Sequence, residues 1–291
     1  MATVTAPGIS QAEAAEVAAG SGVAGSGVAG SGAPAGDPHP GPPEDRLIRG
    51  QGTTAAQWRA WPGWRDLRAA SAGELVPPGR RVVIVAPHPD DEVLGAGGLL
   101  AATAREGRER LLVAVTDGLA SHPGSRLWPA CTLGAQRRRE TGAALRELDA
   151  ACPVLRLGID DGRIAGATSV LAQALAALIT PDDVIVSPWR FDGHPDHEAV
   201  GRVTAMTAEA VGACHLEAPI WAWHWAAPGD HRVPWPRAAV LHLDETLAQR
   251  KRAAAGCFTS QLEPDPSTGA DAILPPWALA RLLHEREVFF R

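Results

Sequence analysis

The chain has 291 residues, 45% of them hydrophobic, and a formal net charge of −6 at pH 7. This apolar content is ample for a sizeable core, so the sequence predicts a globular protein. Nucleic acid is excluded as a partner because the chain has no surplus of Lys and Arg with which to follow a phosphate backbone. A membrane is excluded too, because no run of roughly 20 apolar residues and no signal-peptide pattern is found, which predicts a cytoplasmic protein.

The N-terminal segment contains "GSGVAGSGVAGSGAPAGDPHPGPP", in which Gly, Ser and Pro leave almost nothing to bury. This composition predicts a disordered low-complexity tail over residues 1–44. The remaining chain, residues 45–291, is predicted to form one domain.

From residue 81 onward, short apolar runs such as "RVVIVAP", "RLLVAVTDG" and "DVIVSPW" alternate with Ala-rich segments of helical length. This alternation predicts an α/β fold with a Rossmann-like, mainly parallel sheet covered by helices on both faces. Sites in such sheets lie beyond the carboxyl ends of the strands. The later Pro- and Trp-rich region, with an expected strand in "PIWAWHWA", is predicted to be a C-terminal elaboration on the substrate side.

Two expected strand ends carry a His-Pro-Asp motif, "PHPDDE" after the first run and "HPDH" after the later one. The motifs supply His88, Asp90, Asp91, His194, Asp196 and His197. Charged groups at the end of a buried strand are costly unless they bind something or act in chemistry. A catalytic zinc site needs three N or O ligands and one open position, and the two motifs supply enough ligands for one.

With these two motifs, the sequence resembles the PIG-L or LmbE-like family of zinc-dependent N-acetylglucosaminyl deacetylases. The resemblance covers roughly residues 81–261 and implies an LmbE-like deacetylase domain. It implies a hydrolase that removes the acetyl group from a small-molecule N-acetyl amino sugar or glycoside. The spacing of residues leaves one alternative open, an amidohydrolase of the same metal chemistry that cleaves a thiol conjugate or a longer acyl chain.

Roles for the motif residues follow from the same resemblance. His88, Asp91 and His197 would hold Zn²⁺ or another divalent transition metal, and Asp90 would be the general base. Adjacent acids in a tight turn point in different directions, so Asp91 can face the metal while Asp90 faces the attacking water.

The resemblance further implies that His194 stabilises the oxyanion, for which a protonated imidazole is expected, and that Asp196 orients its ring. Weaker echoes of the family make Arg137 and Asp161 substrate contacts. Some family members have a tyrosine two residues before the second motif, whereas this chain has Asp192 there and no tyrosine.

Other residues near the motifs have two possible roles. Glu92 would either cap the helix that follows the first motif or support the site. Several further His and Trp side chains would either line the pocket or belong to the core. They are His122, His224, Trp221, Trp223, Trp225 and Trp235.

Overall fold

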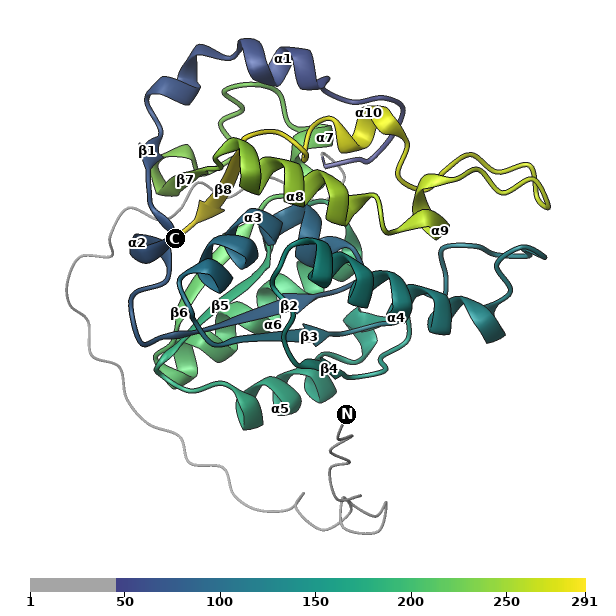
Figure 1. The fold of residues 1–291 in the computed structure, drawn as a ribbon, viewed down its shortest axis with the longest axis horizontal. Helices are drawn as coiled ribbons and strands as arrows, with labels where there is room; N and C mark the ends of the chain where they lie inside the picture. The colour runs from purple at the N-terminus through teal and green to yellow at the C-terminus, as the bar shows by residue number, and fades with distance from the viewer. Residues whose placement is uncertain (1–45) are drawn as a thin grey trace, which may run out of the picture. The chain divides into compact units, whose positions relative to one another are not determined.

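A computed structural model describes residues 46–291 (Figure 1), and the predicted tail over residues 1–44 lies outside the described residues. Within them, the strands are β1 (Arg68–Ala69), β2 (Arg81–Ala86), β3 (Arg110–Ala114), β4 (Val154–Arg156), β5 (Asp183–Pro188), β6 (Cys214–Ala218), β7 (Ala238–His242) and β8 (Arg286–Phe290). They form one sheet in the order β1-β7-β8-β6-β5-β2-β3-β4. All neighbouring strands are parallel except for β8, which is antiparallel to β6 and β7. The predicted α/β fold with a mainly parallel sheet is therefore confirmed.

Helices fill most of the connections between strands. The α-helices are α1 (Ala55–Ala60), α2 (Ala72–Leu75), α3 (Asp91–Arg105), α4 (Ala130–Glu147), α5 (Thr168–Leu178), α6 (Pro195–Val211), α7 (Ala222–Trp225), α8 (Glu245–Ala255), α9 (Thr259–Leu262) and α10 (Pro276–Leu279). Short 3-10 helices are η2 (Pro62–Arg65), η3 (Ile164–Gly166) and η4 (Trp235–Arg237). None of the helices in the described part of the chain is both long and apolar enough to cross a bilayer.

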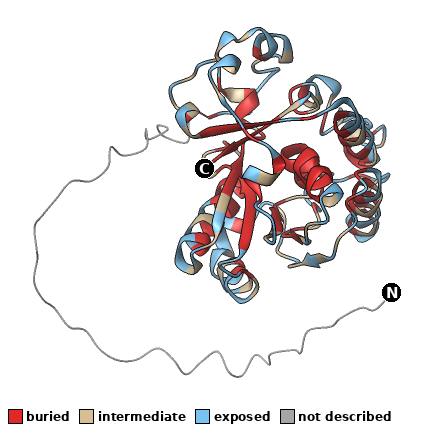
Figure 2. Cartoon of the chain, turned by 60° about the vertical axis from the view of Figure 1, so that its left-hand side comes forward, coloured by how far each residue is buried: buried red, intermediate tan, exposed pale blue. Residues whose placement is uncertain are grey.

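Strand β2 shows why the sheet is covered on both faces. Val82 and Ile84 pack into one core cluster, with side chains from α3, α4 and α8. Val83 and Val85 point to the opposite face and pack into a second cluster, with side chains from α5 and α6. Successive side chains of a strand face opposite sides, so a continuous apolar run must be covered twice. Figure 2 shows the central strands of this sheet mostly as buried, and residues 82–86 of β2 are buried throughout.

Close packing of α3 against β8 and against Leu243, which precedes α8, depends on Gly98. A side chain at Gly98 would meet Leu243 at 2.3 Å. The backbone N–H groups of Gly98 and Leu99 donate to the Glu287 carboxylate on β8, at 2.7 and 2.9 Å. The same carboxylate lies 2.8 Å from Nζ of Lys251 on α8, so a buried ion pair joins α3, α8 and β8. Figure 1 shows α8 lying over α3.

The stretch "PIWAWHWA" is not a strand, contrary to the sequence prediction. It follows β6 and forms the short helix α7. The Asp192 carboxylate accepts backbone N–H groups from residues 220, 221 and 222, at 2.9, 3.0 and 2.9 Å, and this binds the start of α7. A tertiary contact therefore overrides the strand preference of alternating tryptophans.

The order of the strands places the site. The chain adds β3 and β4 on one side of β2 and adds β5 and β6 on the other side. The connections after β2 and β5 therefore diverge at this point of the sheet, and ligands of parallel α/β sheets bind in the resulting crevice. Both His-Pro-Asp motifs follow these two strands.

Candidate metal centre and active site

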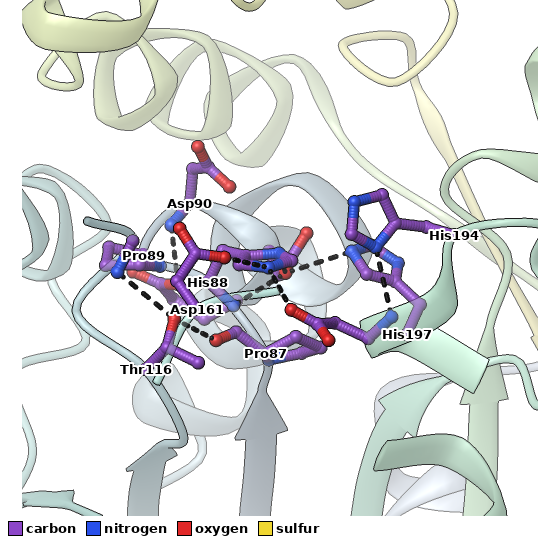
Figure 3. A network of polar contacts seen from close by, with 12 residues as sticks. Pro87, His88, Pro89, Asp90, Thr116, Asp161, His194 and His197 are labelled. Carbon is purple, nitrogen blue, oxygen red and sulfur yellow. Dashed lines mark hydrogen bonds and ion pairs between the residues drawn. The ribbon is translucent and has the colours of Figure 1, made fainter. Parts of the chain in front are cut away.

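The two motifs meet beyond the carboxyl ends of β2 and β5. Figure 3 shows His88 near the centre of a polar network, with Asp161 on one side and His194 and His197 on the other. One nitrogen from each of the three histidines lies within 4.8 Å of the others. The predicted convergence of the separated motifs is therefore seen in the structure.

Asp91 stands between two of the histidines. Its Oδ2 lies 3.3 Å from Nδ1 of His88 and 3.3 Å from Nε2 of His197. Nε2 of His197 is buried and makes no hydrogen bond within the described residues. A tetrahedral zinc ion with bonds of about 2.0–2.2 Å separates its ligand atoms by about 3.3–3.6 Å. Two imidazole nitrogens and a carboxylate oxygen at this spacing fit such an ion.

Both imidazoles are held at the nitrogen that faces away from Asp91. Nε2 of His88 lies 3.2 Å from carboxylate oxygens of both Asp161 and Asp196. Nδ1 of His197 lies 2.8 Å from Oδ2 of Asp192. Carboxylates that accept the second N–H of a ligating histidine fix its tautomer and ring orientation. This arrangement leaves Nδ1 of His88 and Nε2 of His197 turned towards Asp91.

The protonation of the cluster fits a metal site as well. Burial opposes the charged forms, but the neighbouring acids raise the pKa of His88 well above its usual value and that of His197 to about 9. Burial likewise opposes ionisation of Asp91, yet His197 and His88 hold its pKa well below the usual range. Both shifts favour protonated imidazoles beside an ionised carboxylate, and a divalent cation held at this site would replace those protons.

The backbone conformation of Asp90 turns its carboxylate away from His88. Asp90 adopts φ +119°, which is uncommon for a residue with a side chain, and Figure 3 shows its carboxylate pointing away from His88. Backbone strain of this kind is concentrated at functional sites. Glu92 Oε2 accepts the Asp90 backbone N–H at 3.0 Å, so Glu92 supports the strained turn at the start of α3.

Arg137 pairs with Asp90. Its guanidinium lies 3.0 Å from Oδ2 of Asp90 and also donates to the carbonyl of Pro89. Burial raises the pKa of Asp90 to about 8, while the Arg137 charge opposes that rise. Arg137 was expected to contact substrate. It lines the pocket but is only 2% exposed, and its hydrogen bonds are with the first motif and the loop after β3.

Asp196 differs from its expected position. It was predicted to orient the ring of His194, but its carboxylate contacts His88 and accepts the backbone N–H of Gly162 at 2.7 Å. Only the backbone N–H of Asp196 reaches His194, where it donates to Nδ1 at 3.3 Å. Asp196 is in the first turn of α6, and its side chain is bound by the loop after β4, which draws it to His88 rather than to His194.

His194 also differs from the expectation of a protonated ring. Burial and the neighbouring His197 lower its pKa to about 3, so the imidazole is neutral. Because Nδ1 accepts from the Asp196 backbone, the ring proton is assigned to Nε2, from which it can be donated. The ring stacks on Trp221, with centroids 6.5 Å apart.

A pocket of about 300 Å³ is lined by the motif residues His88, Asp90, Asp91, His194 and His197. Its volume is within the usual range for a small-molecule site. Asp161, the other predicted substrate contact, lines it and also touches His88. Trp221 and His224 belong to the lining, whereas His122 does not. Trp223 and Trp235 instead pack against Trp58 in the core.

Sequence reasoning missed the role of Asp192, which was noted only as a departure from the tyrosine of some family members. The residue is fully buried and bonds both His197 and the start of α7. Its position five residues before a motif histidine was the one available signal. That spacing does not reveal which nitrogen of the ring the carboxylate holds.

Comparison with known proteins supports the motif analysis. Residues 83–208 match the family described as PIG-L, GlcNAc-PI de-N-acetylase. A 1D-myo-inositol 2-acetamido-2-deoxy-alpha-D-glucopyranoside deacetylase from Nocardioides sp. is 40% identical, over 69% of this chain and 74% of that protein. The chain belongs to the PIG-L family. The family expected from the two motifs is thereby confirmed.

A second relative and one solved structure are also similar to this chain. A deacetylase of the same name from Mycobacteroides abscessus is 28% identical, over 67% of this chain and 73% of that protein. Among solved structures, N,N'-diacetylchitobiose deacetylase from Pyrococcus horikoshii is similar with a TM-score of 0.45 and 20% identity. That match covers 63% of this chain and 71% of the other.

Proposed function

We propose that this protein is a zinc-dependent N-deacetylase that hydrolyses the acetamide of an N-acetyl amino sugar or its glycoside. The observation that carries the proposal is the pair of 3.3 Å separations from Asp91 to the two imidazoles, next to the strained Asp90 in the same pocket. Membership of the PIG-L family and the deacetylase names of the relatives support the reaction and the substrate class.

His88, Asp91 and His197 would hold the zinc ion. The chemistry that zinc supplies in such a site is Lewis acidity, which lowers the pKa of water and polarises a carbonyl. The carboxylates of Asp192 and Asp196 keep the two imidazoles turned towards Asp91. The chain therefore presents its three ligand atoms in a preset arrangement.

Asp90 would move the proton. Arg137 binds Oδ2 of this carboxylate, which leaves Oδ1 to take a proton from the attacking water. The water oxygen forms a bond to the acetyl carbon, the C–N bond breaks, and the proton passes from Asp90 to the leaving amine. A base whose pKa is near the working pH is the most effective in both transfers.

His194 would stabilise the negative charge that develops on the carbonyl oxygen. Its neutral ring has the proton on Nε2, and stacking on Trp221 fixes the direction of that N–H. A fixed donor aimed at a developing oxyanion contributes more than it would in water, because it needs no reorganisation during the reaction.

The direct test combines metal analysis with an assay of acetate release. We expect about one divalent ion per chain in the purified protein, and acetate released from N-acetylglucosaminides. Substrates that differ only in the acyl chain, together with thiol-conjugate amides, should be hydrolysed more slowly. A protein that binds no divalent metal, or that cleaves only the other amides, would refute the proposed function.

A further inference from the structure

Arg281 is a buried cation in the lining of the same pocket. It follows α10 and is 4% exposed, and it shares the pocket lining with the three histidines and Asp91. Four Arg or Lys side chains are this deeply buried in the described residues. Three of them have a carboxylate partner: Arg46 with Glu198, Arg137 with Asp90, and Lys251 with Glu287.

Arg281 has no such partner within residues 46–291. One terminal nitrogen donates to Nδ1 of His224 at 3.0 Å, and the other donates to the carbonyl of Gln51. The guanidinium carbon lies 5.0 Å from the ring centre of Trp277. Its Nε is buried and makes no hydrogen bond within the described residues. All the contacts are with neutral groups, and only two of the five guanidinium N–H donors make hydrogen bonds within the described residues.

His224 does not supply the missing negative charge. Its Nε2 donates to the carbonyl of Arg49 at 2.9 Å, and its Nδ1 accepts from Arg281. A ring that accepts at Nδ1 is neutral, and burial together with the Arg281 charge lowers the pKa of His224 in the same direction. A buried guanidinium without a counter-ion is costly unless an anion binds to it.

The pocket connects this cation to the reaction centre. His194 stacks on Trp221, whose ring lies 6.3 Å from His224, and His224 contacts Arg281 directly. The lining of the shared pocket also includes the apolar side chains of Leu94, Ile220, Ile273, Leu274, Ala278 and Leu282. A ligand that places its acetamide at the histidines would therefore occupy the same, partly apolar cavity as the guanidinium.

We propose that Arg281 binds an anionic group, a carboxylate or a phosphate, on the part of the substrate that is attached to the amino sugar. The inference rests on the proposed function, since it identifies the substrate class of the same pocket. A planar guanidinium in an apolar surrounding suits both anions, because it can offer parallel donors to two of their oxygens.

The test compares substrates that differ in this charge. The carboxymethyl glycoside of N-acetylglucosamine and its carboxamide have nearly the same size, and N-acetylglucosamine 1-phosphate is compared with the methyl glycoside. We expect the wild-type protein to favour an acid over its neutral counterpart by about 10- to 100-fold in kcat/KM, mainly through KM. Whichever pair gives the larger ratio identifies the anion.

Variants of Arg281 assign the preference to this residue. Arg281→Gln should bring the acid-to-neutral ratio close to one, and Arg281→Lys should retain part of it. Arg286→Gln is the matched control, because Arg286 also lies over an indole, that of Trp64, but is absent from the pocket lining. This control should keep the wild-type ratio.

Binding of the same four compounds is also measured by calorimetry, which does not depend on turnover. Tighter binding of an acid in the wild-type protein supports the proposal even if the Arg281 variants fail to fold. Equal kcat/KM and equal binding for acid and neutral compounds would overturn the anion subsite while leaving deacetylation intact. Acid-selective binding without any acetate release would instead overturn the proposed function and retain the subsite.

Discussion

Asp192 Oδ2 lies 2.8 Å from Nδ1 of His197, and this contact fixes the ring of a proposed metal ligand. The carboxylate itself cannot rotate freely, because it also accepts three backbone N–H groups from residues 220–222. Asp192 and His197 are both completely buried. The start of α7 is thus coupled, through one carboxylate, to the direction in which Nε2 of His197 points.

Asp192→Asn should weaken metal binding by about 10- to 100-fold, the usual effect of losing a carboxylate that orients a ligating histidine. Affinity is measured by competition with a chelator of known zinc affinity. Asp183→Asn is the control, because Asp183 is a buried acid at the other end of β5 that pairs with Arg81. Equal metal affinity in both variants and the wild type would show that Asp192 does not position His197.

Arg137→Gln should shift the pH profile of kcat/KM. Asp90 acts as a base only when it is deprotonated, and the Arg137 charge favours that form. Removal of the cation raises the pKa of Asp90, so the rising limb of the profile should move to higher pH by about one unit. Arg137→Lys retains the charge and should give a smaller shift. If the rising limb of the kcat/KM profile of Arg137→Gln stays at the wild-type pH, the ion pair with Arg137 does not set the pKa of Asp90.

His194→Ala should retain the metal and lose about 10²- to 10³-fold in kcat, as expected when a single oxyanion donor is removed. Metal content and steady-state deacetylation are measured on the same preparation. His88 and His197 are each held by a carboxylate, and His194 makes no hydrogen bond to either ring or to Asp91, so its loss should leave the ligand set in place. A metal-free variant would make His194 a ligand instead of a donor.

Lys251→Met should lower the free energy of unfolding by about 3–5 kcal/mol, because it leaves the Glu287 carboxylate buried without its cation. Both side chains are at most 3% exposed. Chemical denaturation measures the loss, and the double variant Lys251→Met/Glu287→Gln should recover part of it. A single variant as stable as the wild type would mean that the two N–H groups from α3 suffice for Glu287.

Much of the fold could be predicted from local sequence. Continuous apolar runs such as Arg81–Ala86 identify strands that are buried on both faces, and the intervening Ala-rich segments indicate crossover helices. The short helix α7 could not be predicted, because it depends on the distant Asp192 carboxylate. Aromatic alternation alone favours a strand in that segment.

The sequence identifies the residues that meet at the candidate site, but it does not predict all the contacts among them. Both motifs identify the residues that converge, since each follows a strand of the same sheet. Spacing cannot reveal that Asp196 turns to His88 instead of His194, because the loop after β4 decides it. Arg281 was missed because a lone arginine near the C-terminus carries no signal until its lack of a counter-ion is visible in three dimensions.

The central claim is that adjacent acids have separate roles, with Asp91 holding the metal and Asp90 moving the proton. The most direct measurement is the metal content and kcat of Asp91→Ala and Asp90→Asn, each purified in the same way as the wild type. Asp91→Ala should lose the metal, whereas Asp90→Asn should keep it and lose about 10²- to 10⁴-fold in kcat with little change in substrate affinity. If Asp90→Asn lost the metal while Asp91→Ala retained it, or if both variants stayed fully active, the assignment of ligand and base would be contradicted.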